Sequence, residues 1–454
     1  MNKINESIFK AYDIRGIYPT QLNEEFAYNL GRGYATFILR DNPKAKNIVI
    51  GSDMRLSSPT LKKELIRGLI ESGLNVVDVG LVSTPTFYFA VGFYKYDGGI
   101  QVSASHNPKE YNGFKMVKNN SLPISKDTGI MEIKNIILEN DFRARKEEGE
   151  IIKKENILQE LVSNQLADID ITKIKKFKIV VDAANSMGAL DMEEFFKKVP
   201  AELIKINFKL DGNFPSHEAD PLKEENLELL RQKVIENKAD FGVAIDGDAD
   251  RYFFVDENGN SLRQEILRGI MAQIELAENS GATVAYDIRP GRITKDMIEE
   301  MGGKSIVTPV GHSLIKEIMI KNEAIFGGES SGHYFYKKPY GTFEMPVILM
   351  AKFLEFLSGK NMAFSEIVQS YKKYFHSGEI NFKVANVAKK LKEAEEKFSD
   401  GEINKLDGVT VEYSDLWFNL RGSNTEPLIR LNLEAKTKEL MEKKVKEVAE
   451  FIKK

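Results

Sequence analysis

The feature that most constrains the fold is an alternation of strand-like runs and helical patterns along a chain of 454 residues. In its first round, Asn47-Ile-Val-Ile50 is the pattern of a buried strand. A helix follows, with Ser58 as its expected N-cap, Pro59 at its first position and Gly73 at its end. The next expected strands are 76–79 and 99–102. Strands that alternate with helices imply a parallel sheet, so the sequence predicts an α/β architecture.

The alternation restarts twice. The expected strands of the second and third rounds include 178–182, 203–206, 241–245, 283–286, 305–307 and 324–326. From about Gly378 the pattern changes to short strands between two helices, which is typical of an α+β domain. A chain of this length exceeds a single core. We expect three similar α/β domains with mixed, mainly parallel sheets and a C-terminal α+β domain. Their predicted bounds are 1–150, 151–255, 256–370 and 371–454, and the charged stretch 143–154 is interpreted as a surface connection.

Composition excludes several classes of protein. Hydrophobic residues make up 42% and charged residues 29% of the chain, which describes a soluble globular protein. No apolar run approaches membrane-spanning length, and Met1-Asn-Lys-Ile-Asn lacks a signal-peptide core. There is no cysteine, and 64 basic residues nearly balance 68 acidic ones. We therefore expect a cytoplasmic protein without disulfides, and no affinity for nucleic acid or membranes.

Polar loops follow the predicted strands at their carboxyl ends, where open α/β sheets bind ligands. The first loop presents Ser105, with His106, Lys109 and Lys115 as flanking groups for proton transfer or phosphate binding. An ordinary Ser-Asn-Pro turn is the alternative. Four of the five histidines stand in or beside such loops, which favours a shared polar site. These four are His106, His217, His312 and His333.

Three alternating aspartates, Asp246, Asp248 and Asp250, follow the strand at 241–245. In extended backbone their side chains would share a face, and oxygen ligands favour magnesium, manganese or calcium. A calcium EF-hand is a weaker match, because Arg251 stands where that loop needs glycine. An aspartyl nucleophile of the Asp-x-Asp phosphatase type remains open. The loop predicts a divalent metal site.

Two further loops carry hydrogen-bonding groups suited to a phosphorylated sugar. Glu329, Ser331 and His333 have the chemistry to bind sugar hydroxyls, although a structural turn is an alternative. Arg421-Gly-Ser-Asn-Thr425 is rich in donors that suit one phosphate, and a plain hairpin turn is its alternative. Together the four loops predict phosphoryl transfer on a sugar phosphate.

The same four loops resemble those of the α-D-phosphohexomutase superfamily, in the family's order and over the whole chain. The opening Ala11-Tyr-Asp-Ile-Arg-Gly16 and the run Pro108–Lys115 are most similar to the phosphomannomutase/phosphoglucomutase branch. The resemblance implies a heart-shaped, four-domain molecule around a central cleft. It also implies an enzyme that interconverts hexose 1- and 6-phosphates, of mannose and/or glucose, as a monomer or weak dimer.

The resemblance further implies that Ser105 is carried as phosphoserine. One Mg²⁺ would be bound by Ser105 and the three aspartates, and a hexose 1,6-bisphosphate would be the intermediate and activator. Lys115, His333, Arg15 and Arg251 would be catalytic. The substrate-binding residues it implies are Tyr12, Arg289, His312, Glu329, Ser331, Arg421, Ser423, Asn424 and Thr425.

Three departures from the branch leave the sugar open. Ser330 stands where relatives often have methionine, Arg289 where they often have lysine, and Tyr340-Gly-Thr-Phe-Glu344 replaces an acidic-acidic-Gly run. Phosphoglucosamine mutase is therefore the nearest alternative function. A metal-dependent sugar phosphatase and a non-catalytic sugar-phosphate binding protein are the others.

Overall fold

The structure, a computed structural model, describes residues 4–143, 147–289, 291–422 and 428–453. It separates into two compact units, each built from two stretches of chain. The first unit contains Met1–Leu262 and Ser331–Ser365, and the second contains Arg263–Ser330 and Glu366–Lys454. Each unit is described by itself.

The first unit begins with a six-stranded mixed sheet. In spatial order its strands are β1 (Ile14–Ile17), β5 (Tyr111–Lys118), β4 (Gly98–Val102), β2 (Asn47–Ser52), β3 (Asn75–Leu81) and β6 (Ile151–Lys153). The strands β4, β2, β3 and β6 run parallel, whereas β5 is antiparallel to both of its neighbours, β1 and β4. The helices between them are α1 (Glu24–Asp41), α2 (Ser58–Glu71), α3 (Thr84–Phe93) and α4 (Met131–Glu139). This arrangement confirms the predicted α/β architecture.

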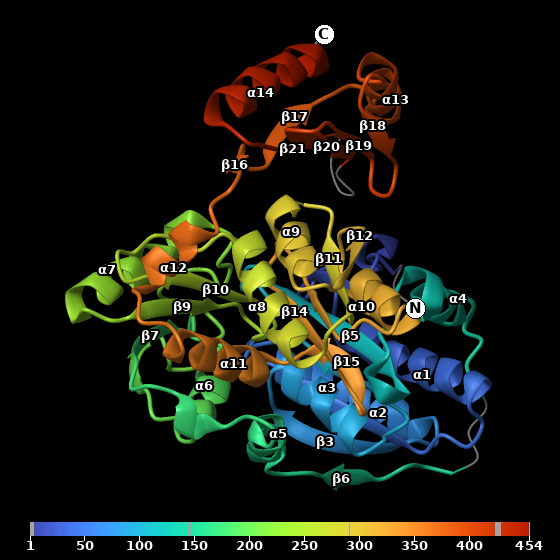
Figure 1. Ribbon diagram of the computed structural model, residues 1–454. Helices are drawn as coiled ribbons and strands as arrows, with labels where there is room; N and C mark the ends of the chain where they lie inside the picture. The colour runs from blue at the N-terminus through green and yellow to red at the C-terminus, as the bar shows by residue number, and fades with distance from the viewer. Residues whose placement is uncertain (1–3, 144–146, 290, 423–427, 454) are drawn as a thin grey trace. The chain divides into compact units, whose positions relative to one another are not determined.

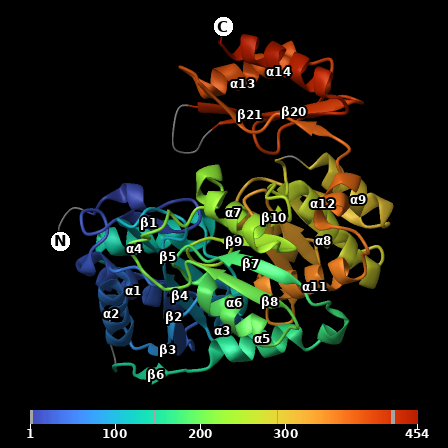
Figure 2. The same cartoon turned by 90° about the vertical axis from the view of Figure 1, so that its left-hand side faces the viewer.

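Helices α1 and α2 lie side by side, as Figures 1 and 2 show, and pack backbone against backbone. A Cβ at Gly31 would lie 2.4 Å from the Leu65 carbonyl oxygen, and one at Gly68 would lie 2.2 Å from that of Tyr28. Asn23 begins α1 by accepting a hydrogen bond from the Phe26 amide at 2.9 Å. Glycines at the crossing thus allow two helices to share one narrow layer over the sheet.

Three local expectations for this sheet need correction. Ser58 is the first residue of α2 rather than its N-cap, and its hydroxyl donates to Asp53 instead. The sequence predicts no strand between the Ser105 loop and residue 178, yet Tyr111–Lys118 forms β5, which pairs with β1 on one side and with β4 on the other. Part of the expected surface connection, Ile151–Lys153, pairs with β3 as an exposed edge strand.

The second sheet also belongs to the first unit. Its spatial order is β10 (Tyr252–Asp256), β9 (Phe241–Ile245), β7 (Lys178–Asp182) and β8 (Glu202–Ile206). The helices of this part are α5 (Ile157–Leu166), α6 (Gly188–Phe196) and α7 (Glu228–Asn237). β9, β7 and β8 are parallel, and β10 turns back antiparallel after the aspartate loop. The unit is completed by β14 (Tyr334–Lys338), β15 (Gly341–Glu344) and α11 (Pro346–Ser358).

The second unit contains three parallel strands and a separate antiparallel sheet. The parallel strands are, in spatial order, β12 (Lys304–Thr308), β11 (Thr283–Asp287) and β13 (Phe326–Gly328). Their helices are α8 (Gln264–Glu278), α9 (Arg292–Glu300) and α10 (His312–Lys321), and α12 (Phe364–Ser370) follows later in the chain. Strand β13 begins two residues after the predicted start of its strand, so Gly327 and Gly328 are inside the sheet.

The C-terminal sheet is antiparallel throughout. Its spatial order is β16 (Phe375–His376), β21 (Leu428–Ala435), β20 (Leu416–Gly422), β19 (Val409–Glu412) and β18 (Glu402–Asn404), and β17 (Ile380–Lys383) also pairs with β21. Helices α13 (Val387–Lys397) and α14 (Lys438–Lys453) cover one face of it, as Figures 1 and 2 show. This is the α+β domain that the sequence predicts.

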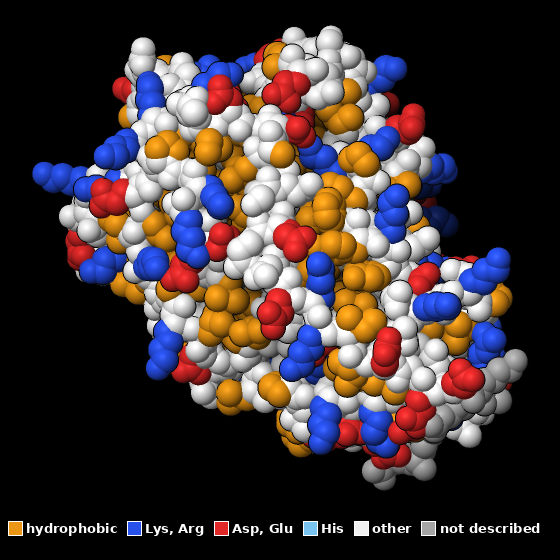
Figure 3. Space-filling model, turned by 90° about the horizontal axis from the view of Figure 1, so that it is seen from below, with side chains coloured by type: hydrophobic (Ala, Val, Ile, Leu, Met, Phe, Trp, Pro, Cys, Tyr) orange, Lys and Arg blue, Asp and Glu red, His pale blue; other side chains and the backbone are white. Residues whose placement is uncertain are grey.

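The face drawn in Figure 3 carries acidic and basic side chains interspersed with one another and with hydrophobic ones. This mixture agrees with a net charge of only −4 and shows no large area of one sign on that face. Among the described residues, no helix combines the length and the hydrophobicity needed to cross a lipid bilayer.

Candidate active site

Ser105 lies in the loop between β4 and β5, at the carboxyl end of β4. Its backbone is left-handed, with φ +51°, a conformation that costs a residue with a side chain roughly 1 kcal/mol. The residue is 1% exposed, and its surroundings are polar. Its hydroxyl donates to Asp246 Oδ2 at 2.7 Å and lies 3.2 Å from His106 Nδ1. The predicted nucleophile therefore contacts the predicted metal loop directly.

The aspartate loop follows β9 as a tight turn. Asp246 Oδ1 accepts hydrogen bonds from the amides of Asp250 and Arg251, and Ala249 is left-handed with φ +63°. The expectation of an extended segment with alternating side chains was wrong, but the expected clustering of the three carboxylates is confirmed. The carboxylates of Asp246, Asp248 and Asp250 are buried and lie within 4.8 Å of one another because the backbone turns around them.

This cluster fits a hard divalent cation. Asp248 Oδ1 and Asp250 Oδ1 are buried and accept no hydrogen bond from the described residues. Burial, and then repulsion from Asp250 and Asp248, raise the pKa of Asp246 well above its ordinary value. A set of carboxylate oxygens suits a hard cation such as magnesium, manganese or calcium. An EF-hand is excluded, since strands flank the loop and Glu257 instead accepts hydrogen bonds from Ser365.

Lys115, on β5, supplies positive charge to the same cluster. Its ammonium lies 2.6 Å from Asp248 Oδ2 and 2.5 Å from Asp250 Oδ2, and the residue is buried. Burial lowers the pKa of Lys115, but the two carboxylates outweigh that effect and hold the pKa well above its usual value. In this arrangement Lys115 is an electrostatic partner of the aspartates.

Two arginines stand beside the loops. Arg15, on β1, donates to Asp13 at 2.7 Å and to the side-chain oxygen of Asn107 in the Ser105 loop at 2.5 Å. Arg251 follows the aspartate loop, with Nε 3.8 Å from Asp246 Oδ2 and 3.9 Å from Asp250 Oδ1. Tyr12 is half-buried just before β1. Arg15 thus contacts the Ser105 loop, and Arg251 lies beside two of the aspartates.

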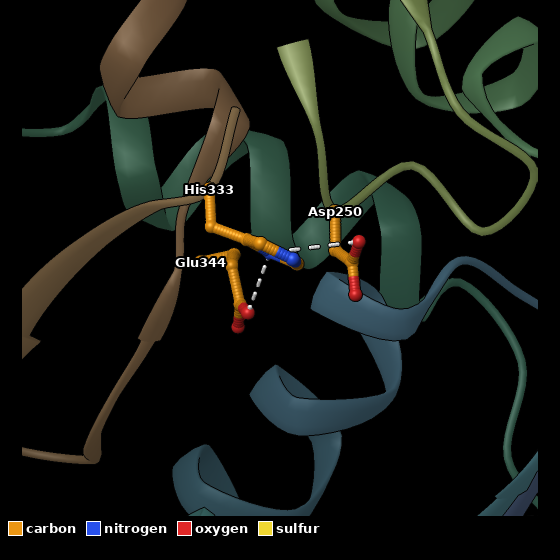
Figure 4. A group of neighbouring side chains, drawn as sticks. All are labelled: Asp250, His333 and Glu344. Carbon is orange, nitrogen blue, oxygen red and sulfur yellow. Dashed lines mark ion pairs between the residues drawn. The ribbon is translucent and has the colours of Figure 1, made fainter. Parts of the chain in front are cut away.

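His333 lies between two carboxylates, as Figure 4 shows. Its Nε2 accepts a hydrogen bond from Arg251 Nε at 3.1 Å, so in the neutral ring the proton is on Nδ1. Nδ1 is 3.2 Å from Glu344 Oε1 and 3.6 Å from Asp250 Oδ1. The imidazole also stacks on the ring of Phe335, 5.8 Å away. Carboxylates and ring stacking hold this histidine in one orientation.

Two of the expected substrate-binding residues, Arg289 and Glu329, lie in a polar cluster of the second unit. Arg289 forms an ion pair with Asp287 Oδ2 at 2.5 Å, while Asp287 Oδ1 accepts from the Ser330 hydroxyl at 3.0 Å. Burial lowers the pKa of Arg289, but Asp287 and Glu329 raise it more, and the net shift is upward. Glu329 is buried and accepts from the amide of Gly311 at 2.7 Å. That contact joins Glu329 to the turn that begins α10.

The other expected substrate-binding residues are placed as follows. His312 is the first residue of α10 in the second unit, and Ser331 is buried in the first unit. Arg421 is the last residue but one of β20 and forms an ion pair with Glu379 Oε2 at 2.8 Å. Ser423, Asn424 and Thr425 lie outside the described residues.

The histidines bear out the shared polar site only in part. His106 and His333 stand at the Ser105 and aspartate loops, whereas His217 pairs with Asp182 at 3.0 Å. Burial, and then nearby Arg251 and Arg15, lower the pKa of His106 well below its usual value.

Several residues that support the site were not singled out from the sequence. Thr84, at the start of α3, donates to Asp248 Oδ2 at 2.5 Å, and its amide donates to the Asp248 carbonyl at 3.0 Å. Glu344 Oε1 lies 3.2 Å from His333 Nδ1. Within the second unit, Glu379 pairs with Arg421. Arg55 contacts the backbone of the Ser105 loop. Each acts through a tertiary contact, and the only local signal was a polar residue next to a predicted strand or loop.

Comparison with known proteins agrees with this geometry. Four models of the phosphoglucomutase/phosphomannomutase family match the chain in order: alpha/beta/alpha domain I at residues 6–144, domain II at 158–259, domain III at 264–374 and the C-terminal domain at 379–451. A phosphomannomutase of Methanocaldococcus jannaschii is 40% identical over 98% of this chain and 97% of its own. One of Vibrio cholerae is 38% identical over 98% of both chains.

A solved structure extends the similarity to the fold. A phosphoglucomutase/phosphomannomutase family protein of Burkholderia thailandensis superposes with a TM-score of 0.92 at 32% identity, covering 99% of this chain and 98% of that one. The matches span the chain from its first loop to its last, as the resemblance of the four loops predicted. The chain therefore belongs to the phosphoglucomutase/phosphomannomutase family.

Proposed function

We propose that this protein is a phosphohexomutase that interconverts the 1- and 6-phosphates of mannose and/or glucose through a phosphoserine at residue 105. The observation that carries the proposal is the hydrogen bond between the Ser105 hydroxyl and Asp246, inside a buried cluster of three aspartates and one lysine. Relatives 38–40% identical over nearly their whole length are named phosphomannomutases, which supports this substrate class.

The proposed chemistry is two phosphoryl transfers. In the first, the bond between phosphorus and Ser105 Oγ breaks while the free hydroxyl of the hexose monophosphate forms a new bond to phosphorus and gives up its proton. In the second, the bisphosphate returns its other phosphoryl group to Ser105. Transfers of this kind need positioning and neutralisation of charge more than covalent help from the protein.

Lys115 and His333 are proposed to handle the proton. Lys115 is protonated between Asp248 and Asp250, which suits an acid or an electrostatic stabiliser. His333 has Nδ1 3.2 Å from Glu344 Oε1, so Nε2 is the proposed acceptor of a substrate proton, and it would give up its hydrogen bond from Arg251 Nε to do so. Arg251 shares that side of the ring, and with Arg15 it is proposed to neutralise the transferring phosphoryl group.

Magnesium is the proposed cofactor, with Asp246, Asp248, Asp250 and the Ser105 oxygen as its protein ligands. The two buried carboxylate oxygens without hydrogen bonds support this assignment. When bound, a divalent cation supplies charge neutralisation at the transferring phosphoryl group. A hexose 1,6-bisphosphate is the proposed intermediate and activator.

The remaining residues are proposed to bind the sugar and its second phosphate. The donor and acceptor chemistry of Glu329 and Ser331 suits sugar hydroxyls, and Tyr12, Arg289 and His312 are proposed to contact the same substrate. Arg421, Ser423, Asn424 and Thr425 are proposed to hold the phosphate that does not react. The pairing of Arg421 with Glu379 supports a fixed guanidinium orientation.

One assay separates the candidate functions. The protein is supplied in turn with mannose, glucose and glucosamine 1-phosphate, each with its 1,6-bisphosphate and magnesium, and 6-phosphate and free phosphate are measured together. We expect isomer formation with mannose or glucose phosphate and little free phosphate. Preference for glucosamine phosphate would indicate a phosphoglucosamine mutase, and free phosphate released as fast as isomer a phosphatase.

The cellular location, oligomeric state and domain organisation of the enzyme are also proposals. We infer a cytoplasmic protein that acts as a monomer or weak dimer, in keeping with the absence of cysteine and the mixed charge of its surface. Four independent domains, at about 1–150, 151–255, 256–370 and 371–454, remain the proposed organisation. Sedimentation at several protein concentrations tests the oligomeric state, and a concentration-independent tetramer would contradict it.

A further inference from the structure

Arg55 is a buried arginine for which the chemistry proposed above has no role. It lies between β2 and α2 in the first unit, and its side chain has no exposed surface. Its charge is balanced by Asp53, whose Oδ2 is 3.3 Å from Arg55 Nε. Burying a guanidinium group is costly unless its N–H groups are used, so the location of these donors indicates what the residue does.

Among the described residues, the terminal nitrogens of Arg55 donate to backbone carbonyls of the Ser105 loop and of the first residue of β5. NH2 donates to Ser105 at 2.7 Å and to Asn107 at 2.5 Å, and NH1 donates to Pro108 at 2.7 Å and to Tyr111 at 2.9 Å. Three carbonyl groups of the loop and one from the start of β5 therefore converge on one planar cation. A guanidinium offers this fork of donors, whereas an ammonium is a compact charge with three N–H groups at a single point.

The carbonyl of Ser105 is the most consequential of the four. Ser105 has φ +51°, a strained conformation that surrounding contacts must hold. The aspartate loop also packs against this carbonyl group: a Cβ added to Gly247 would lie 2.2 Å from the Ser105 carbonyl oxygen. A rotation of this peptide would thus move the Ser105 hydroxyl and the aspartate loop relative to each other.

Side chains on two sides of Arg55 hold its guanidinium group in place. Asp53 Oδ1 accepts from the Arg55 amide at 3.0 Å and from the Ser58 hydroxyl at 2.6 Å, which fixes the carboxylate beside Nε. On the other side, the ring of Phe214 lies 5.1 Å from the guanidinium carbon. The guanidinium group is held in place by residues of three separate chain segments.

We propose that Arg55 is a positioning residue that fixes the left-handed backbone of Ser105, and so sets the direction of its oxygen for phosphoryl transfer. The inference rests on the proposed phosphoserine function of Ser105. It predicts a defect in transfer to and from Ser105, because misplacement of a reacting atom by about 1 Å can lower a rate by roughly a hundredfold. Binding of the sugar phosphate should change little, since Arg55 has no exposed surface with which to contact it.

The test compares Arg55→Lys with Arg67→Lys, a matched control on the same stretch of chain whose side chain is 52% exposed. Dephosphorylated proteins are mixed with hexose 1,6-bisphosphate and magnesium, and phosphate on Ser105 is followed by intact mass. Mutase kcat and KM and the melting temperature are measured in parallel. We expect Arg55→Lys to lose about a hundredfold in phosphorylation rate and kcat with KM within about threefold of wild type. Arg67→Lys should equal wild type.

A second variant keeps the test decisive if Arg55→Lys fails to fold. Asp53→Asn retains Arg55 but removes the carboxylate beside Nε, and should slow phosphorylation of Ser105 about tenfold. Wild-type rates in a folded Arg55→Lys protein, or in Asp53→Asn where Arg55→Lys does not fold, would overturn the inference. A rise in KM that matches the loss in kcat/KM would overturn it as well. If wild-type protein itself takes up no phosphate, the proposed function fails rather than the role of Arg55.

Discussion

Ser105 Oγ donates a hydrogen bond of 2.7 Å to Asp246 Oδ2 across 141 residues of sequence. The bond joins the loop after β4 to the loop after β9, and both loops belong to the same compact unit. Gly247 lets them approach, because any side chain there would collide with the Ser105 carbonyl. The hydroxyl and the aspartates therefore form one site, on which the proposed phosphoryl transfer depends.

The close approach at Gly247 can be tested by adding one methyl group. Gly247→Ala would place a Cβ 2.2 Å from the Ser105 carbonyl oxygen and force the two loops apart. We expect kcat to fall by about a hundredfold or more, since the displacement is on the order of 1 Å. The control is Gly359→Ala, where the nearest atom to an added Cβ is 3.4 Å away. Equal activity in both variants would show that the two loops need not touch.

Asp248 is expected to be essential for the metal. Asp248→Asn removes one charge from the three-carboxylate cluster, so the magnesium concentration for half-maximal activity should rise at least about tenfold, with most activity lost. A magnesium titration of mutase activity measures this, with the exposed Asp127→Asn as control. An unchanged titration curve in Asp248→Asn would argue against a cation at this cluster.

Glu344 is expected to act through His333. Its Oε1 lies 3.2 Å from His333 Nδ1, and Glu344→Gln keeps the shape but removes the charge that orients and stabilises the imidazole. We predict a fall in kcat of about tenfold with little change in KM. Glu355→Gln, at a partly exposed position in α11, is the control. If the Glu344 variant keeps the wild-type kcat, His333 is not oriented by this carboxylate during turnover.

The His217–Asp182 pair predicts how stability depends on pH. Burial lowers the pKa of His217, but the hydrogen bond to Asp182 and its charge outweigh that effect and raise the pKa. A raised pKa in the folded state stabilises the fold fully below the unfolded value of about 6.5, and this contribution is lost as pH rises through the folded pKa. His217→Asn should therefore lower the melting temperature more at about pH 5.5 than at about pH 9. A pH-independent difference would contradict the assignment.

The sequence predicted much of this site because its signals are local. Ser105 and Asp246 each follow a recognisable strand, and the carboxyl ends of strands in α/β sheets are where ligands bind. The repeated alternation of strands and helices likewise predicted the α/β domains. The aspartates were expected to meet, although the reason was a turn at Ala249 rather than an extended run.

What the sequence did not reveal depends on contacts between distant segments. Arg55 stands after a predicted strand like many other polar residues, and its role appears only when four carbonyls converge on it. Thr84 and Glu344 were missed for the same reason. Strand β5 was missed because its polar residues, among them Lys115, are buried in the site rather than placed in an apolar pattern.

The most direct test of the account is the intact mass of the purified protein before and after incubation with hexose 1,6-bisphosphate and magnesium. We predict the mass of one added phosphoryl group on Ser105, its transfer to a hexose monophosphate, and its absence in Ser105→Ala. That variant should lose mutase turnover but bind sugar phosphate, while the exposed Ser163→Ala behaves as wild type. Full mutase activity in Ser105→Ala, or a phosphoryl group carried on another residue during turnover, would contradict the central claim.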